Sequence, residues 1–247
     1  MLEWSHLSYH VRSFVSMIKA VFFDLYNTLA RFDPPREQTQ MQAARQCGLE
    51  PDLQGLVRGY ADADRFMTEQ NSRLHIQKMA REDRLKFFAG YERLVLKGGG
   101  IDASLELAAE VWAKVREQRY ALAPFDDAIP TLQALKERGL VLGLISNIYR
   151  DLDELCGRLG IAPYLDLKVS SMSAGAEKPH PPIFLTALKE SGVEPQEAIH
   201  VGDQYHGDVV GARGVGIRPV LLDRDGLLAE HDDVERITAL SEVLGLV

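Results

Sequence analysis

Short apolar runs alternate with helical patterns along two parts of the chain. Runs rich in β-branched and aromatic residues predict five buried strands, at residues 18–23, 140–145, 165–170, 198–201 and 217–222. Between the later runs, apolar residues at helical spacing predict helices over residues 126–138, 151–159, 182–190 and 208–213. Such alternation is typical of a parallel sheet covered by helices. We therefore predict an α/β fold, a doubly wound parallel sheet with a Rossmann-like core.

Residues 35–122 interrupt this rhythm, because they contain no strand-like run. Their pattern predicts helices over residues 37–46, 52–70, 81–96 and 103–120. Pro34-Pro35 and Ala123-Pro124 stand at the two ends of the segment. A helical bundle entered and left through two adjacent linkers can hinge, so we predict a lid over the carboxyl edge of the sheet. We divide the chain into a core domain, residues 17–34 and 123–247, and an all-helical cap domain, residues 35–122.

Residues 1–16 precede the first predicted strand. They have neither a basic lead nor a sustained apolar core, so they do not look like a secretory signal peptide. Met17 stands directly before the strand, where a compact form of this fold can begin. We predict that residues 1–16 are a peripheral N-terminal extension, and one interpretation is that the natural protein starts at Met17.

Composition narrows the classes of partner. The 247 residues carry a net charge of −8, which argues against nucleic acid as a partner, and no apolar run is long enough to cross a membrane. The two cysteines, Cys47 and Cys156, lie far apart and indicate a reducing compartment, so we expect a cytoplasmic protein. Composition does not distinguish a monomer from a homodimer.

Polar side chains follow the predicted strands at the points where these end. The residues concerned are Asp24 and Thr28, Ser146 and Asn147, Lys178, and Asp203 with Asp208. Because the carboxyl ends of parallel strands meet at one edge of a sheet, we expect these groups to share a pocket. Asp24 is the most informative of them, since it ends a strongly apolar strand and a buried carboxylate needs a cation or another partner.

The residue types predict a particular chemistry. Asp24 and Asp203 supply the hard oxygen ligands that Mg²⁺ prefers, and Asp208 can join them directly or through water. Lys178 adds a compact positive charge that can hold Asp24 and an anionic small-molecule substrate. Ser146 can bind a phosphoryl oxygen. Asp24 can then attack phosphorus as a nucleophile and form an acyl phosphate that water hydrolyses.

The arrangement resembles the haloacid dehalogenase-like hydrolase superfamily over residues 18–223. The four motifs of that family appear in order, as Asp24-Leu25-Tyr26-Asn27-Thr28-Leu29, Ser146-Asn147, Lys178-Pro179, and Gly202-Asp203 with Asp208. The helical insertion matches the family's helical cap. The resemblance implies that the backbone carbonyl of Tyr26 is a further metal ligand. It also implies a catalytic group of Asp24, Thr28, Ser146 and Lys178, with Tyr26, Asn27 and Asn147 beside the substrate.

Tyr26 departs from the phosphatase pattern of the family. Phosphatases carry a second Asp there, which protonates the leaving group, and tyrosine, with an ordinary pKa near ~10, is a poor substitute. The family's dehalogenases carry an aromatic Tyr at this place, because a halide leaves without a general acid. They also place an Arg of the cap over the substrate carboxylate, and Arg36 and Arg45 are the candidates here.

The fourth motif favours the opposite conclusion. Metal-dependent members of the family carry two acids in this motif, as this chain does with Asp203 and Asp208, whereas dehalogenases have Ser and Asn. Without a cation, such paired acids beside Asp24 repel one another. We predict a Mg²⁺-dependent phosphatase-like hydrolase of small phosphorylated metabolites. Two alternatives stay open: a metal-independent 2-haloacid dehalogenase, and a binding or regulatory homologue with slow turnover.

Two further residues carry separate expectations. Asn27 occupies a place where related sequences often have Gly, and we expect it to adopt the left-handed backbone conformation that Asn tolerates. Its amide is also a candidate for a hydrogen bond to the substrate. His200 lies inside a predicted strand, and we interpret it as a satisfied core or edge residue.

Overall fold

A six-stranded sheet forms the centre of the protein in the computed structural model, which describes residues 17–149 and 151–247. The predicted extension, residues 1–16, lies outside the described residues. The strand order is β5-β4-β1-β6-β7-β8, and every pairing is parallel. The strands are β1 (Ala20–Phe23), β4 (Val141–Ser146), β5 (Leu167–Ser170), β6 (Ala198–Gly202), β7 (Arg218–Leu222) and β8 (Glu235–Ile237).

Helices cover both faces of this sheet. Successive side chains of a strand point to opposite faces, so Val21 and Phe23 of β1 enter one apolar layer and Ala20 and Phe22 the other. All four are fully buried, as in a strand covered on both sides. The first layer is closed by α5 (Ala128–Glu137), α6 (Leu152–Arg158) and η5 (Leu240–Gly245), and the second by α8 (Pro181–Ser191) and α9 (Gly211–Gly214). The predicted doubly wound α/β core is confirmed.

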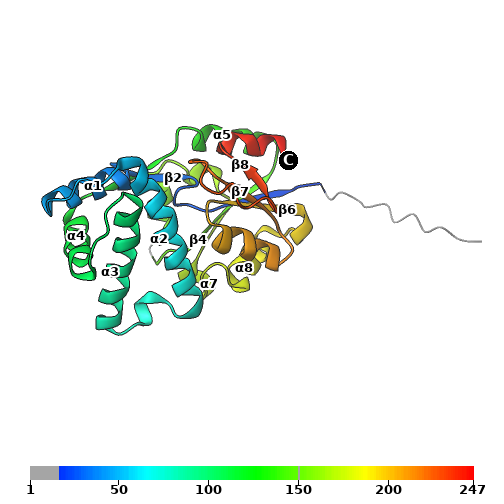
Figure 1. The fold of residues 1–247 in the computed structure, drawn as a ribbon. Helices are drawn as coiled ribbons and strands as arrows, with labels where there is room; N and C mark the ends of the chain where they lie inside the picture. The colour runs from blue at the N-terminus through cyan, green and yellow to red at the C-terminus, as the bar shows by residue number, and fades with distance from the viewer. Residues whose placement is uncertain (1–16, 150) are drawn as a thin grey trace, which may run out of the picture.

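Four helices follow one another between β2 (Ala30–Asp33) and β3 (Ala121–Pro124). Figure 1 shows them gathered to one side of the sheet. They are α1 (Arg36–Gln46), α2 (Leu53–Arg73), α3 (Arg81–Gly98) and α4 (Leu105–Glu117), with the short η1 (Ile76–Lys78) between α2 and α3. We call this segment the helical insertion. Its helices pack mainly in the order α1, α4, α3, α2, so it forms a small bundle with apolar clusters of its own.

Glycines allow α2 and α3 to approach closely. A Cβ atom at Gly59 would lie 2.3 Å from the carbonyl oxygen of Val95, and one at Gly98 would lie 2.4 Å from the Cα of Gly59. Gly98 is the last residue of α3, and only Gly100 of the Gly98-Gly99-Gly100 run has a positive φ, of 84°. The sequence pattern alone suggests a flexible turn here, but close helix packing explains Gly98.

A second, two-stranded sheet joins the insertion to the core. Strand β2 (Ala30–Asp33), just before the first domain boundary expected from the sequence, pairs antiparallel with β3 (Ala121–Pro124), which spans the second. These strands were not predicted from the sequence, because each has four residues and is only partly buried. Paired strands connect the two parts of the chain through a shared ladder, and not through two independent linkers.

The remaining elements are short. Besides those above, the structure contains α7 (Ser171–Ala174), η2 (Ala162–Tyr164), η3 (Pro195–Glu197) and the π-helix η4 (Tyr205–Val210). The predicted helix at residues 208–213 is wrong in its start, since the π-helix begins at Tyr205, and β8 was not predicted. Within the described part of the chain, no helix has both the length and the apolar character needed to cross a membrane.

Candidate active site

Asp24 lies at the carboxyl end of β1, in the middle of the sheet. Its backbone N–H donates to the carbonyl of Val201 at 2.9 Å, which continues the pairing of β1 with β6. The side chain is buried, and Lys178 Nζ lies 2.5 Å from Oδ1. Burial raises the pKa of Asp24 to about 6, an effect that the charge of Lys178 opposes and that of Asp208 reinforces. Asp24 is thus a buried carboxylate held by one cation.

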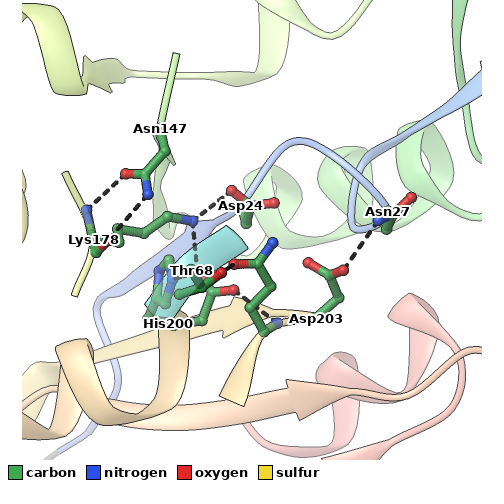
Figure 2. A network of polar contacts seen from close by, with 9 residues as sticks. Asp24, Asn27, Thr68, Asn147, Lys178, His200 and Asp203 are labelled. Atoms are coloured by element: carbon green, nitrogen blue, oxygen red, sulfur yellow. Dashed lines mark hydrogen bonds and ion pairs between the residues drawn. The ribbon is translucent and has the colours of Figure 1, made fainter. Parts of the chain in front are cut away.

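Lys178 lies between two carboxylates, as Figure 2 shows for its contact with Asp24. Nζ is 2.5 Å from Asp24 Oδ1 and 2.6 Å from Asp208 Oδ1. Burial alone would lower the pKa of Lys178, but Asp208 and Asp24 together raise it above its ordinary value. The ammonium group therefore stays charged in the pocket.

Asn147 fixes the backbone that carries Lys178. Its Oδ1 accepts from Lys178 N at 2.7 Å, and its Nδ2 donates to Lys178 O at 3.0 Å (Figure 2). Because both ends of the amide are engaged on the peptide of Lys178, Asn147 ties the loop after β4 to the segment before α8. The predicted substrate contact of Asn147 stays a prediction, and the structure shows a holding role for the lysine.

Asp208 accepts from three donors. Oδ1 receives Lys178 Nζ at 2.6 Å and His200 Nε2 at 2.8 Å, while Oδ2 accepts from the backbone N–H of Gln204 at 3.0 Å. Burial would raise the pKa of Asp208, but Lys178 and His200 outweigh it and lower the pKa below the ordinary value. A Cβ atom at Gly202 would lie 2.1 Å from Asp208 Cγ, so the glycine of the Gly202-Asp203 motif makes room for this side chain.

Asp203 has no cationic side chain paired with it in the part of the chain that the structure describes. Its Oδ2 accepts from Asn27 Nδ2 at 3.2 Å, and its buried Oδ1 has no hydrogen-bond partner among the described residues. Burial raises the pKa of Asp203 well above its ordinary value, and the charges of Asp24 and Asp208 add to the shift. Asn27 has a φ of 56°, which confirms the left-handed conformation expected for it. Its amide contacts Asp203 (Figure 2).

Two buried hydroxyls and one aromatic ring complete the set of predicted residues. Thr28 Oγ1 and Ser146 Oγ are buried and have no hydrogen-bond partner within the described ranges. A buried unsatisfied hydroxyl is unusual, so both are available to a bound group. The ring of Tyr26 stacks on Phe32, with centroids 5.8 Å apart and planes at 14°. The stacked ring takes the place where family phosphatases carry their acid.

The polar groups fit a hard cation beside Asp24 and Asp203. In residues 17–149 and 151–247, no group of three or more His, Cys, Asp or Glu side chains forms a metal cage. Mg²⁺ does not require one, since it is bound through one or two carboxylates plus water and substrate phosphate. Asp203 Oδ1 is a buried oxygen without a partner among the described residues, and the charge of Asp24 adds to the raised pKa of Asp203. The donor set therefore matches a Mg²⁺ ion.

The helical insertion contacts the core next to three of the motifs. Thr68 of α2 donates to Gln204 Oε1 at 3.0 Å (Figure 2), and His75 Nε2 lies 2.5 Å from Glu177 Oε1, beside Lys178. The ring of His75 also lies edge-on to Tyr149, with centroids 5.2 Å apart. These contacts were not predicted from the sequence, because nothing in the local pattern of the insertion shows which residues face the core.

A cavity of about 620 Å³ lies between the insertion and the core and reaches Asn27 and Asp203. Its arginines are paired with acids: Arg36 Nη1 lies 2.5 Å from Asp64, and Arg224 lies 2.9 Å from Asp127. The cavity is large enough for a small phosphorylated metabolite. Arg45, the other candidate for a substrate carboxylate, pairs with Glu50 on the surface.

Comparison with known proteins agrees with this geometry. A family model described as haloacid dehalogenase-like hydrolase matches residues 18–216. The chain belongs to this family of hydrolases. A glyceraldehyde 3-phosphate phosphatase of Methanopyrus kandleri is 32% identical over 228 residues, which cover 89% of this chain and 88% of the relative. The resemblance drawn from the four motifs is therefore confirmed.

Solved structures of the haloacid dehalogenase-like (HAD) family include both phosphatases and dehalogenases. A HAD phosphatase from Thermococcus onnurineus is 25% identical, with a TM-score of 0.53 and coverage of 93% of this chain and 97% of that chain. A 2-haloacid dehalogenase from Pseudomonas syringae pv. Tomato is 26% identical, with a TM-score of 0.55 and coverage of 93% and 98%. Similarity in fold does not separate the two activities, so the side chains of the site must do so.

Proposed function

We propose that this member of the haloacid dehalogenase-like family is a Mg²⁺-dependent phosphatase of small phosphorylated metabolites. The observation that carries the proposal is the buried Oδ1 of Asp203, which has no partner among the described residues and lies near enough to Asp24 for that charge to raise the pKa of Asp203. A reaction without a metal has no use for a second buried carboxylate beside the nucleophile. The phosphatase from Methanopyrus kandleri, related over most of its length, supports the same class.

The proposed metal site consists of Asp24, Asp203 and the backbone carbonyl of Tyr26. The ion would neutralise the carboxylates and the substrate phosphate, which lets like charges approach one another. Asp208 is a candidate ligand from the sequence, but its Oδ1 already accepts from Lys178 and His200. We therefore infer that Asp208 holds Lys178 in place and would contact the ion only through a water molecule.

Each residue of the pocket has a distinct task in the proposed reaction. The carboxylate of Asp24 attacks phosphorus, the bond from phosphorus to the leaving oxygen breaks, and the phosphoryl group is held as an acyl phosphate on Asp24. Lys178 and the hydroxyls of Ser146 and Thr28 bind phosphoryl oxygens. Water then cleaves the acyl phosphate and restores Asp24 with release of inorganic phosphate.

Tyr26 limits the leaving groups that such a site can expel. A neutral phenol stacked on Phe32 is a weak acid, so an alkoxide leaving group receives little help. We expect phosphates with good leaving groups, such as aryl and acyl phosphates, to react much faster than alkyl phosphates. A rate that does not depend on the pKa of the leaving group would refute this role of Tyr26.

A 2-haloacid dehalogenase is the second candidate, favoured by Tyr26 alone. The Arg that such an enzyme needs for the substrate carboxylate is not evident, because Arg36 and Arg45 already pair with Asp64 and Glu50. The paired acids of the fourth motif also oppose this candidate. A slow-turnover binding protein is the third, since it would keep the metal site without rapid chemistry.

One experiment separates the three candidates. Release of phosphate from p-nitrophenyl phosphate and acetyl phosphate is measured with Mg²⁺ and with EDTA, and chloride release from L-2-chloropropionate is measured in parallel. We expect Mg²⁺-dependent phosphate release and no chloride. Metal-independent chloride release would establish the dehalogenase, and Mg²⁺ binding by calorimetry without turnover would establish the binding protein.

A further inference from the structure

His200 lies in the centre of β6 and is completely buried. Its ring contacts the edge of Phe184, with centroids 5.2 Å apart and planes at 89°. Nε2 lies 2.8 Å from Asp208 Oδ1, and Nδ1 has no hydrogen-bond partner in the described part of the chain. A strand this deep normally carries an apolar residue, so the single polar contact of the imidazole needs an explanation.

The contact between His200 and Asp208 defines which nitrogen of the imidazole ring carries the proton. Asp208 Oδ1 is an acceptor, because it also receives Lys178 Nζ at 2.6 Å, so Nε2 of His200 must donate. Nδ1 has no hydrogen-bond partner among the described residues, so a proton on Nδ1 would be buried without an acceptor. The ring therefore carries its one N–H at Nε2 and leaves Nδ1 bare.

A continuous chain of contacts leads from this ring to the nucleophile. His200 Nε2 donates to Asp208 Oδ1, Lys178 Nζ donates to the same oxygen, and Nζ also contacts Asp24 Oδ1 at 2.5 Å. The other oxygen of Asp208 is held by Gln204 N. Without His200, Asp208 would keep only two donors, and its Oδ1 would be free to turn with Lys178 away from Asp24.

We propose that His200 is a positioning residue: an Nε2–H donor that fixes Asp208 so that Lys178 points at Asp24. The role concerns the proposed phosphatase reaction and rests on that function, but the hydrogen bond itself is independent of it. His200 touches neither the substrate nor the reacting atoms. Its effect therefore reaches the reaction through the position of the Lys178 ammonium group, which must lie correctly to within a fraction of an ångström.

Two substitutions separate the hydrogen bond from packing. His200→Leu fills the apolar site without a donor, whereas His200→Gln offers an uncharged amide N–H at a comparable reach. We expect His200→Leu to lower kcat by about 10- to 100-fold with KM changed less than about 3-fold, since misplacement of a catalytic group affects the chemical step. We expect His200→Gln to recover most of the loss. Ile199→Val, on the same strand and facing the other layer, serves as a packing control and should keep kcat.

The ring state is measured without any turnover. Nitrogen-15 NMR of the wild-type imidazole should show the Nε2–H tautomer at every pH where the protein is folded, with a slowly exchanging Nε2 proton. A Nδ1–H tautomer would overturn the proposal. So would unchanged kcat in His200→Leu, or equal losses in both variants at equal thermal stability. Should the wild type lack phosphatase activity, the proposed function fails, and the NMR experiment still decides whether the donor exists.

Discussion

The ammonium nitrogen of Lys178 lies 2.5 Å from Oδ1 of Asp24, and both side chains are almost wholly buried. This contact is the main source of positive charge for the nucleophile among the described residues, and it opposes the negative charge of Asp208 nearby. Lys178→Met removes that charge and should raise the pKa of Asp24 above its present value of about 6. We expect kcat for p-nitrophenyl phosphate to fall about 10²- to 10³-fold at neutral pH.

Lys178→Arg provides the matched control for that loss. Arginine keeps the charge but is larger than the ammonium group and cannot fit between the two carboxylates in the same way. The variant should recover less than a tenth of the lost rate while restoring thermal stability toward wild type. Full activity in Lys178→Arg would show that charge alone, without position, is what the pocket needs.

Asp203→Asn should have opposite effects on Mg²⁺ binding and on the thermal stability of the metal-free protein. Oδ1 of Asp203 is buried without a partner among the described residues, and the raised pKa means that ionisation of this carboxyl costs stability, so the amide should stabilise the metal-free protein. We expect a higher melting temperature in EDTA, together with loss of the Mg²⁺-induced increase expected of the wild type and loss of phosphatase activity. Thermal unfolding with and without Mg²⁺ measures this directly. A lower melting temperature in EDTA would mean that Asp203 is stabilising as it stands.

The sequence predicted the parallel core and the residues at its edge, because strand ends of a parallel sheet converge whatever their spacing along the chain. It also predicted the left-handed Asn27. It did not predict that Asn147 would hold the backbone of Lys178, or that His200 would contact Asp208, since both are contacts between distant segments. The ladder of β2 with β3 was missed for a different reason, because its strands are too short and too exposed for a clear apolar pattern.

The contact between His75 and Glu177 links the insertion to the segment that carries Lys178. His75 Nδ1 accepts from Gln77 N at 3.1 Å, so Nε2 carries the proton and faces Glu177 Oε1 at 2.5 Å. His75→Ala leaves a buried carboxylate unpaired and should weaken closure of the insertion over the cavity. We expect KM to rise about 5- to 10-fold, which corresponds to about 1–1.4 kcal/mol.

A double-mutant cycle with Glu177→Gln tests whether this effect belongs to the pair. The two changes should be far from additive, since they remove the same contact. Lys114→Ala is the control, because Lys114 pairs with Glu117 on the exposed side of α4 and such surface pairs contribute little. Additive effects of His75→Ala and Glu177→Gln on KM would disprove the coupling.

Glu92 makes the stability of the insertion depend on pH. Burial raises its pKa from 4.5 to about 8, with an opposing effect from its hydrogen bond with Gln40. The folded state therefore holds a proton that the unfolded chain releases above pH 4.5, so this contribution to stability is present at low pH and is lost as the pH rises to about 8. Glu92→Gln should flatten that dependence. Urea unfolding at pH 5 and pH 8 measures it, and equal pH dependence in both proteins would contradict the assignment.

Gly59 sets the distance between α2 and α3, and its replacement tests the packing of the insertion. In Gly59→Ala the new Cβ would lie 2.3 Å from the carbonyl oxygen of Val95, a backbone atom that cannot move alone. We expect a loss of about 1–3 kcal/mol in the free energy of unfolding. Gly157→Ala in α6 is the matched control, because its Cβ meets nothing within 4 Å, and it should stabilise the protein by up to about 1 kcal/mol. If the two variants changed stability alike, helix propensity and not close approach would explain Gly59.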